Sequence, residues 1–178
     1  RTNAMGYYDL SHSMGRWISF IYRMSQSYVD QYFKRYNLSS GQFAFLLLLY
    51  REDGRKQDDL AKAIDMDKGT TARALAKLEA SGYIIRIRDE KDRRVLRVHL
   101  TDKAREVRKP IYEVLHRWNE VSVLGLTPEE NQTLLTLLRK VSVNIRDQKE
   151  RGWQAPLRDA SELLELPPKK SSKGTTTE

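Results

Sequence analysis

The chain has 178 residues, and 39% of them are hydrophobic, which is enough for one compact domain with appendages. The formal net charge of +8 favours a polyanionic partner, nucleic acid first and an anionic membrane second, with a soluble protein rich in lysine as the plain alternative. The absence of cysteine excludes disulfides, thiolate zinc sites and thiol-based redox sensing.

No apolar N-terminal segment resembles a signal peptide. The longest apolar run, residues 43–50, is far shorter than the ~20 residues that a membrane-spanning helix needs. We therefore expect a cytoplasmic protein that makes no contact with a membrane.

Apolar side chains recur at helical spacing over residues 13–36, which predicts a long helix. They are Met14, Trp17, Ile18, Ile21, Tyr28, Tyr32 and Phe33. A stripe of this length exceeds what a small domain usually buries, which indicates a partner chain; an ordinary core helix is the alternative. We expect a mixture, part core and part dimer interface.

A second helix is expected over residues 41–51, with Ser39 or Ser40 as its N-cap. Its apolar face contains Phe43, Leu46, Leu47 and Tyr50, widened by Phe45, Leu48 and Leu49. A helix that is apolar on most sides is buried, so this one should lie centrally.

Residues 56–64 predict a third helix. Lys56 is a poor N-cap, so the first amide N–H groups stay open, and open N–H groups favour a phosphate oxygen. Gln57 adds a side-chain donor. A solvated helix end explains each residue equally well.

The next helix starts near Asp67 and ends at Gly82, which suits a left-handed stop. Thr71, Leu75 and Leu78 share one stripe that should face the core. The opposite face is small and cationic and contains Lys68, Gly69, Thr70, Ala72, Arg73, Ala76 and Lys77.

Two strands are expected over residues 84–88 and 95–100, because the second alternates apolar and polar side chains. The tip between them, residues 89–94, contains three cations and three anions. A helix-turn-helix followed by such a hairpin is a winged helix. The major groove of DNA admits one helix, and a basic hairpin tip reaches the adjacent minor groove, where the negative potential attracts arginine.

A long helix is expected over residues 102–124, kinked at Pro110 because proline lacks the N–H that a helix interior needs. The last helix should begin at Thr127 as N-cap, with proline at N1 and Glu130 at N3, and end near residue 151. Residues 152–178 lose the pattern, and their composition predicts a flexible tail.

The order and spacing of these motifs resemble those of the multiple-antibiotic-resistance (MarR) type transcriptional regulators. The resemblance covers roughly residues 17–149, and the departures are Ala104, where the family often has glycine, and Pro110. The matching motifs are Leu60-Ala61, Met66-Asp67-Lys68-Gly69-Thr70, Leu78-Glu79-Ala80-Ser81-Gly82-Tyr83-Ile84, Arg88-Asp89, Asp92-Arg93-Arg94 and Leu100-Thr101.

The resemblance implies a mainly α fold with a small β-hairpin wing, in which a winged helix-turn-helix is flanked by long dimerisation helices. The expected parts are an N-terminal dimerisation helix in 5–37, the DNA-binding domain in 38–101, C-terminal dimerisation helices in 102–151 and the tail in 152–178. The implied function is sequence-specific transcriptional regulation, as a repressor and a homodimer on a near-palindromic operator in double-stranded DNA.

Three groups of residues are candidates for DNA contact. The candidates are Lys68, Gly69, Thr70, Arg73 and Lys77 on the recognition helix, Arg88, Asp92, Arg93 and Arg94 on the wing, and Lys56 and Gln57 at the helix start. Asp92 and Arg94 are two apart on a hairpin, so they can pair. Either this is a surface ion pair worth at most ~1 kcal/mol, or Asp92 orients Arg94 for the minor groove.

In the family, a small aromatic or lipophilic anion often binds between the winged helix and the dimerisation helices. The cleft would be lined here by Trp17, Ile21, Phe43, Leu47, Tyr50 and Tyr112. Such residues are more often plain core, so the ligand site stays unknown and a small-molecule effector stays an open partner.

Enzyme chemistry has no residue set in this sequence. His12, His99 and His116 do not fall in metal-ligand spacing, and no phosphate loop or nucleophile elbow is present, so we expect neither a metal nor a cofactor. The alternative to a DNA-binding regulator is a winged-helix module for protein–protein or non-specific chromatin contact.

Overall fold

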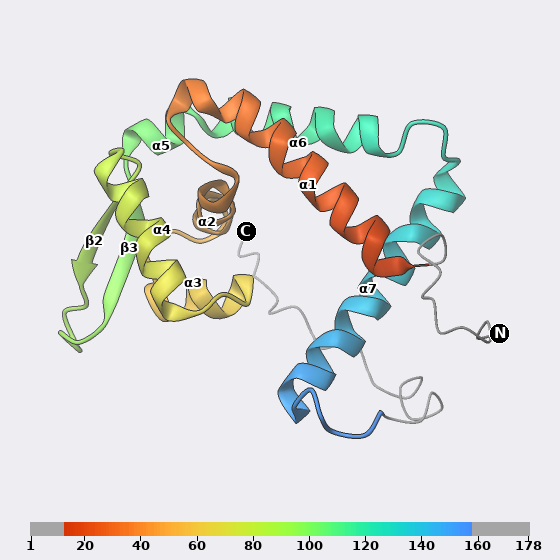
Figure 1. The fold of residues 1–178 in the computed structure, drawn as a ribbon. Helices are drawn as coiled ribbons and strands as arrows, with labels where there is room; N and C mark the ends of the chain where they lie inside the picture. The colour runs from red at the N-terminus through yellow and green to blue at the C-terminus, as the bar shows by residue number, and fades with distance from the viewer. Residues whose placement is uncertain (1–12, 158–178) are drawn as a thin grey trace, which may run out of the picture. The chain divides into compact units, whose positions relative to one another are not determined.

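The structure is a computed structural model that describes residues 13–157. The chain divides into two compact units, Arg1–Ser122 and Val123–Glu178. Figure 1 shows a small sheet, short helices and longer helices in the first unit, and a long helix in the second.

The winged helix was predicted correctly in its helices and hairpin. Its elements are α2 (Ser40–Arg51), β1 (Arg55–Lys56), α3 (Gln57–Ile64), α4 (Lys68–Ala80), β2 (Ile84–Arg88) and β3 (Leu96–Leu100). The three strands form one antiparallel sheet in the order β1-β3-β2, so β3 is central. The sequence did not indicate β1, because a two-residue strand shows no alternation.

Before the winged helix, α1 (Met14–Phe33) continues into the 3₁₀ turn η2 (Lys34–Tyr36). The hydroxyl of Ser13 caps α1 by accepting the Arg16 N–H at 3.2 Å. The helix packs against α6 (Arg108–Ser122), and Figure 1 shows the two lying alongside each other. The rings of Tyr28 and Trp118, with centroids 5.2 Å apart, form part of this contact.

The expected helix over residues 102–124 is wrong as a single kinked element. It is divided into α5 (Asp102–Glu106) and α6, with Val107 as the C-cap of α5. Pro110 therefore lies in the first turn of α6, where the missing N–H costs nothing. The clash of its ring with the carbonyl four residues earlier places the break before the proline rather than at it.

The core is centred on α2, which packs against α1, α3, α4 and β3. Of the predicted face, Leu46 and Tyr50 are buried, whereas Phe43 and Leu47 are only partly buried. Phe45 and Leu49, which were expected only to widen that face, are almost completely buried. Elements lie on several sides of α2, so periodicity alone could not select its most buried side. Ser39 is the N-cap of α2, where it forms a capping box with Gln42.

The second unit contains α7 (Pro128–Arg151), whose predicted start and end are confirmed. Glu130 accepts the Thr127 N–H at 2.8 Å, and the Thr127 hydroxyl accepts the Glu130 N–H at 3.2 Å. No residue of α7 is buried within this chain, so Leu134, Leu137 and Leu138 remain exposed. The helix α1 also leaves apolar residues exposed, among them Met14, Trp17, Ile18 and Ile21.

Among the described residues, no helix combines the length and the apolar character that crossing a bilayer requires. The tail predicted over residues 152–178 lies outside the described part of the chain from residue 158 onward.

We expect Leu75→Ala to lower the free energy of unfolding by about 2–5 kcal/mol, because it leaves a cavity where a side chain with 0% exposure packs α4 onto the core. Leu124→Ala is the matched control, since Leu124 is 86% exposed. Denaturant unfolding at one protein concentration measures both. Equal losses in the two variants would contradict the position of Leu75 in the core.

Candidate nucleic-acid interface

The turn between α3 and α4 fixes the angle of the second helix. Asp65 ends α3 in the left-handed conformation with φ of +58°, which aspartate tolerates better than most residues. Asp67 then caps α4 by accepting the Thr70 N–H at 2.8 Å. This hydrogen bond is the main reason that the pKa of Asp67 is lowered, so the cap stays ionised. The first turn of α4, which contains most of the predicted reading residues, is therefore firmly held.

The two sides of α4 divide as the sequence predicted. Thr71, Leu75 and Leu78 are completely buried. Lys68, Gly69, Arg73 and Lys77 are exposed, and Thr70 is partly exposed. Arg73 donates from Nη2 to the Thr70 hydroxyl at 2.9 Å, which directs the guanidinium toward the helix start. The result is an exposed face of small and cationic side chains.

The start of α3 lies close to the wing. Lys56 is an exposed N-cap residue without a side-chain capping bond, and Oε1 of the half-buried Gln57 has no hydrogen-bond partner. A polar pocket of about 340 Å³ opens here. It is lined by Lys56, Gln57, Asp58, Asp59, Lys62, Arg94, Val95 and Leu96. The structure thus brings the helix-start candidates next to Arg94, although the sequence separates them widely.

The wing tip contains the pair that was predicted from spacing. Arg94 donates to Asp92 Oδ1 from Nε at 3.2 Å and from its backbone N–H at 3.1 Å. The Arg94 side chain is 92% exposed, so the pair is a surface pair that orients a cation rather than a buried one. Arg88 donates to the Arg93 carbonyl at 2.7 Å, which ties the base of the wing to its tip.

A carboxylate that the sequence analysis did not select holds the tip together. Asp89 Oδ1 accepts the backbone N–H groups of Lys91 and Asp92 at 2.9 and 3.1 Å, and Asp89 Oδ2 accepts from Arg97 Nε. These bonds lower the pKa of Asp89 to about 2; the Arg97 bond has the largest effect, followed by the two backbone bonds. The sequence alone could not indicate the Asp89–Arg97 contact, because that contact depends on the strand register.

A second missed contact joins α4 to the hairpin. Glu79 accepts from Arg86 Nη2 at 2.6 Å and from Arg86 Nε at 3.0 Å, and the Arg86 backbone N–H donates to it at 3.2 Å. The Arg86 side chain lowers the pKa of Glu79. This clamp joins the last turn of α4 to β2.

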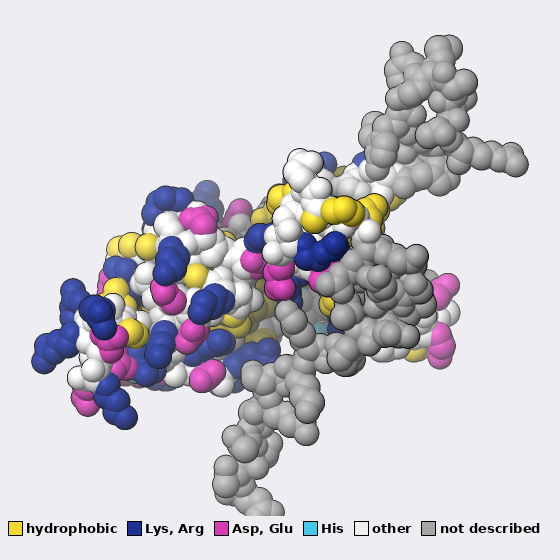
Figure 2. Space-filling model, turned by 90° about the horizontal axis from the view of Figure 1, so that it is seen from below, with side chains coloured by type: hydrophobic (Ala, Val, Ile, Leu, Met, Phe, Trp, Pro, Cys, Tyr) yellow, Lys and Arg dark blue, Asp and Glu magenta, His cyan; other side chains and the backbone are white. Residues whose placement is uncertain are grey.

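The surface of this region is basic but mixed. Figure 2 shows Lys and Arg side chains over the winged helix, interspersed with Asp and Glu. Lys68 Nζ lies 2.9 Å from Asp58 Oδ2, so one of the candidate cations is already paired within the chain. Within the described residues, no group of His, Cys, Asp and Glu is arranged to hold a metal ion.

The profile of the MarR family matches residues 38–96, which cover the winged helix up to the start of β3. The chain is 35% identical over 143 residues to the uncharacterized HTH-type transcriptional regulator YybA of Bacillus subtilis, covering 78% of this chain and 90% of the relative. A MarR transcriptional regulator from Methanosarcina mazei is 37% identical, with a TM-score of 0.69 over 75% of this chain and 96% of that one.

A third protein, a putative MarR family transcriptional regulator from Listeria monocytogenes, was solved in complex with 26mer DNA. It is 29% identical and has a TM-score of 0.73 over 79% of this chain and 95% of that one. Members of this family are transcriptional regulators rather than enzymes. The identity and the coverage, together with the matching winged helix, establish that this chain belongs to the MarR family and is a DNA-binding transcriptional regulator.

Proposed function

We propose that the chain is a homodimeric repressor that acts in the cytoplasm on a near-palindromic operator. The observation that carries the proposal is the exposed cationic face of α4, held by the Asp67 cap, next to a wing whose Arg94 is oriented by Asp92. The complex of the Listeria monocytogenes regulator with DNA supports the same mode of action here.

Within this proposal, α4 enters the major groove. Lys68, Thr70, Arg73 and Lys77 reach base edges or phosphates, because short polar and cationic side chains near a helix start suit that groove. Gly69 lets the backbone approach closely. A Cβ at this position would lie 3.3 Å from Asp67 Oδ1, so a side chain would also disturb the cap.

The wing and the start of α3 provide the remaining contacts. Arg94 enters the minor groove, where a planar and weakly hydrated cation is favoured. Arg88 and Arg93 meet phosphates, as do Lys56 and Gln57 at the open end of α3. The pocket that α3 and the wing line together supports one continuous contact with the DNA backbone there.

The dimer proposal depends on apolar faces that this chain does not cover. Trp17 and Ile21 on α1 are 53% and 54% exposed, and Leu137 on α7 is 52% exposed. We assign dimerisation to residues 5–37 and 102–151, and DNA binding to residues 38–101. Two-fold symmetry would then place the half-sites about 10 bp or a multiple of it apart.

A small aromatic or lipophilic anion is the proposed effector class. Of the residues considered for its cleft, Tyr50 and Tyr112 lie with ring centroids 6.1 Å apart. The Arg108 guanidinium lies 5.5 Å from the Tyr50 centroid and 5.8 Å from the Tyr112 centroid. Rings beside a guanidinium suit an aromatic carboxylate. Trp17 and Ile21 are exposed instead, and Phe43 and Leu47 are packed against the core.

The alternative, a module for protein–protein or non-specific chromatin contact, would not need an oriented arginine on the wing. A gel shift on the DNA upstream of the chain's own gene, with unrelated competitor DNA, separates the two functions. Specific retention in excess competitor supports the regulator.

We expect sedimentation at micromolar concentration to give twice the 20.8 kDa mass of one chain. Leu137→Asp should shift the protein toward monomer, because it places a charge on the apolar stripe of α7. Thr136→Asp, on the opposite side of the same helix, is the control and should stay dimeric. A monomeric parent chain would refute the dimer.

We expect Arg73→Ala to cost about 1–3 kcal/mol of binding free energy per half-site and to relax specificity at one base pair, if Arg73 reads a guanine. If Arg73 contacts only phosphate, affinity should fall evenly across sequences. Fluorescence anisotropy on a set of single-base operator variants measures the difference. A variant with the affinity and specificity of the parent would show that this face of α4 does not read DNA.

We expect Arg94→Ala to weaken operator binding strongly while folding and dimerisation stay intact. Asp92→Ala should also weaken it, because the Arg94 guanidinium loses its orienting partner. Simple electrostatics predicts the opposite sign, since the substitution removes an anion near phosphates. Anisotropy at two salt concentrations decides between them. Tighter binding by Asp92→Ala would leave the tip as a charged patch without a positioning role.

A further inference from the structure

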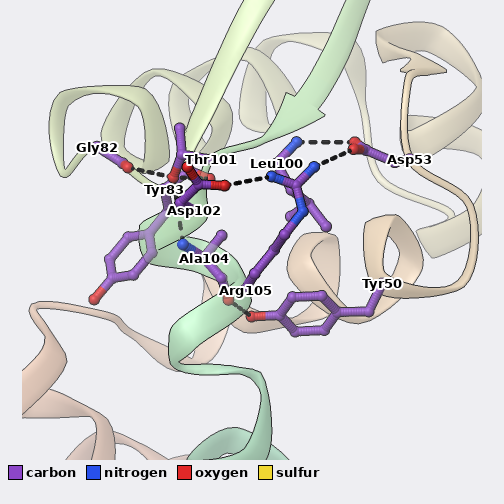
Figure 3. Close-up of polar contacts among 9 residues, drawn as sticks. All are labelled: Tyr50, Asp53, Gly82, Tyr83, Leu100, Thr101, Asp102, Ala104 and Arg105. Atoms are coloured by element: carbon purple, nitrogen blue, oxygen red, sulfur yellow. Dashed lines mark hydrogen bonds and ion pairs between the residues drawn. The ribbon is translucent and has the colours of Figure 1, made fainter.

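The turn between α2 and β1 receives contacts from two distant parts of the winged-helix unit. Asp53 Oδ1 accepts the N–H groups of Gly54 at 2.9 Å and Leu100 at 2.8 Å. Asp53 Oδ2 accepts from Arg105 Nη2 of α5 at 3.1 Å. Figure 3 shows Arg105 reaching from α5 to this carboxylate, which also holds the end of β3. One side chain thus joins the turn, the central strand and the helix that leaves the winged helix.

The same turn also holds the wing. Its Gly54 carbonyl accepts from Arg97 Nη1 at 3.0 Å, and Arg97 donates from Nε to Asp89, which organises the wing tip. Gly54 has φ of +72°, and a Cβ there would lie 2.8 Å from the His99 ring. Another residue at this position would be strained by the positive φ, and the His99 ring would have to move aside. The polar contacts run without interruption from the wing tip to α5.

A second bond fixes α5 at this place. The Tyr50 hydroxyl of α2 donates to the Ala104 carbonyl at 2.5 Å (Figure 3). Burial raises the pKa of Tyr50 to about 12, so this phenol stays protonated and remains a donor under ordinary conditions. The Lys103 Nζ of α5 also donates to the Ser81 carbonyl at 2.7 Å, so side chains attach α5 to the winged helix at Asp53, Tyr50 and Ser81.

We infer that Asp53 and Arg105 are positioning residues for DNA binding, because together they hold α5 at a fixed angle to the sheet. A change in α5 and α6 then reaches the wing tip through Gly54, Arg97 and Asp89. The inference rests on the proposed contact between the wing and DNA. Neither residue needs to touch the nucleic acid.

The test compares Arg105→Met with Arg117→Met. Arg105 also pairs with Asp102 three residues earlier, and Arg117 pairs with Glu120 three residues later, so both substitutions remove one cation and one such surface pair. Only Arg105 is also bonded to Asp53. Hydrogen exchange of the wing amides, residues 89–95, is the readout that does not require DNA.

We expect Arg105→Met to speed exchange in the wing while exchange in α4 keeps its parent rate, and to weaken operator binding roughly fivefold. The salt dependence of binding should keep its slope, because a lost phosphate contact would lower it by about 0.9. Asp53→Asn should also speed wing exchange and weaken operator binding, although it removes an anion. Arg105→Lys, which keeps the cation, should bind the operator as the parent chain does. Arg117→Met should behave as the parent chain in both measurements.

Wing exchange and affinity equal to those of Arg117→Met would overturn the inference, and a lower salt slope would make Arg105 a phosphate ligand instead. The proposed function fails separately, if the parent chain shows no specific binding or if Arg94→Ala binds as the parent does. The exchange experiment still tests the connection between α5 and the wing in that case. Asp53→Asn gives a second test if Arg105→Met does not fold.

Discussion

The packing of α4 onto α2 is the contact on which the exposed cationic face of α4 depends. Burying Leu75 and Leu78 contributes roughly 1.5–3 kcal/mol for each side chain. Rotating the helix by one residue, about 100°, would expose that stripe and press Arg73 or Lys77 toward the core, where an unpaired charge costs far more. The hydrophobic effect therefore chooses which side of α4 meets solvent. The Asp67 cap then fixes where the helix begins, so rotation and start are set by separate forces.

The wing faces a different constraint, because its cations repel one another and no core supports the tip. Asp89 counters this repulsion by accepting hydrogen bonds from two backbone N–H groups of the tip and from Arg97. Asp92 places a second carboxylate beside the Arg94 guanidinium. With Arg94 92% exposed, its pair contributes little to stability. In the proposed contact with DNA, its effect would be to limit the orientations of the guanidinium before binding. Ordering such a side chain on binding costs about 0.5–1.5 kcal/mol, so prior orientation favours the complex by a comparable amount.

The sequence predicted features that depend on local spacing. The stripe of α4, the hairpin, the capping box at Thr127 and the Asp92–Arg94 pair all follow from neighbours a few residues apart. What it missed depends on tertiary contacts. The short β1 is defined only by its pairing with β3, and the buried side of α2 depends on the elements around it. The Asp53–Arg105 pair depends on the fold, and the Asp89–Arg97 pair depends on the strand register. The break before Pro110 was misplaced because the ring acts on the preceding turn.

The free winged helix already pairs several of its candidate reading cations within the chain. Lys68 lies against Asp58, Arg73 donates to Thr70, and Arg94 donates to Asp92. A net charge of +8 alone would favour any DNA, because counterion release is independent of sequence. Nearby carboxylates reduce this attraction at the contact surface itself. If Lys68 and Arg73 read DNA as proposed, a matching site must offer hydrogen bonds good enough to replace their internal partners. On this argument, acids within a basic surface increase discrimination between sequences and lower the affinity for arbitrary DNA.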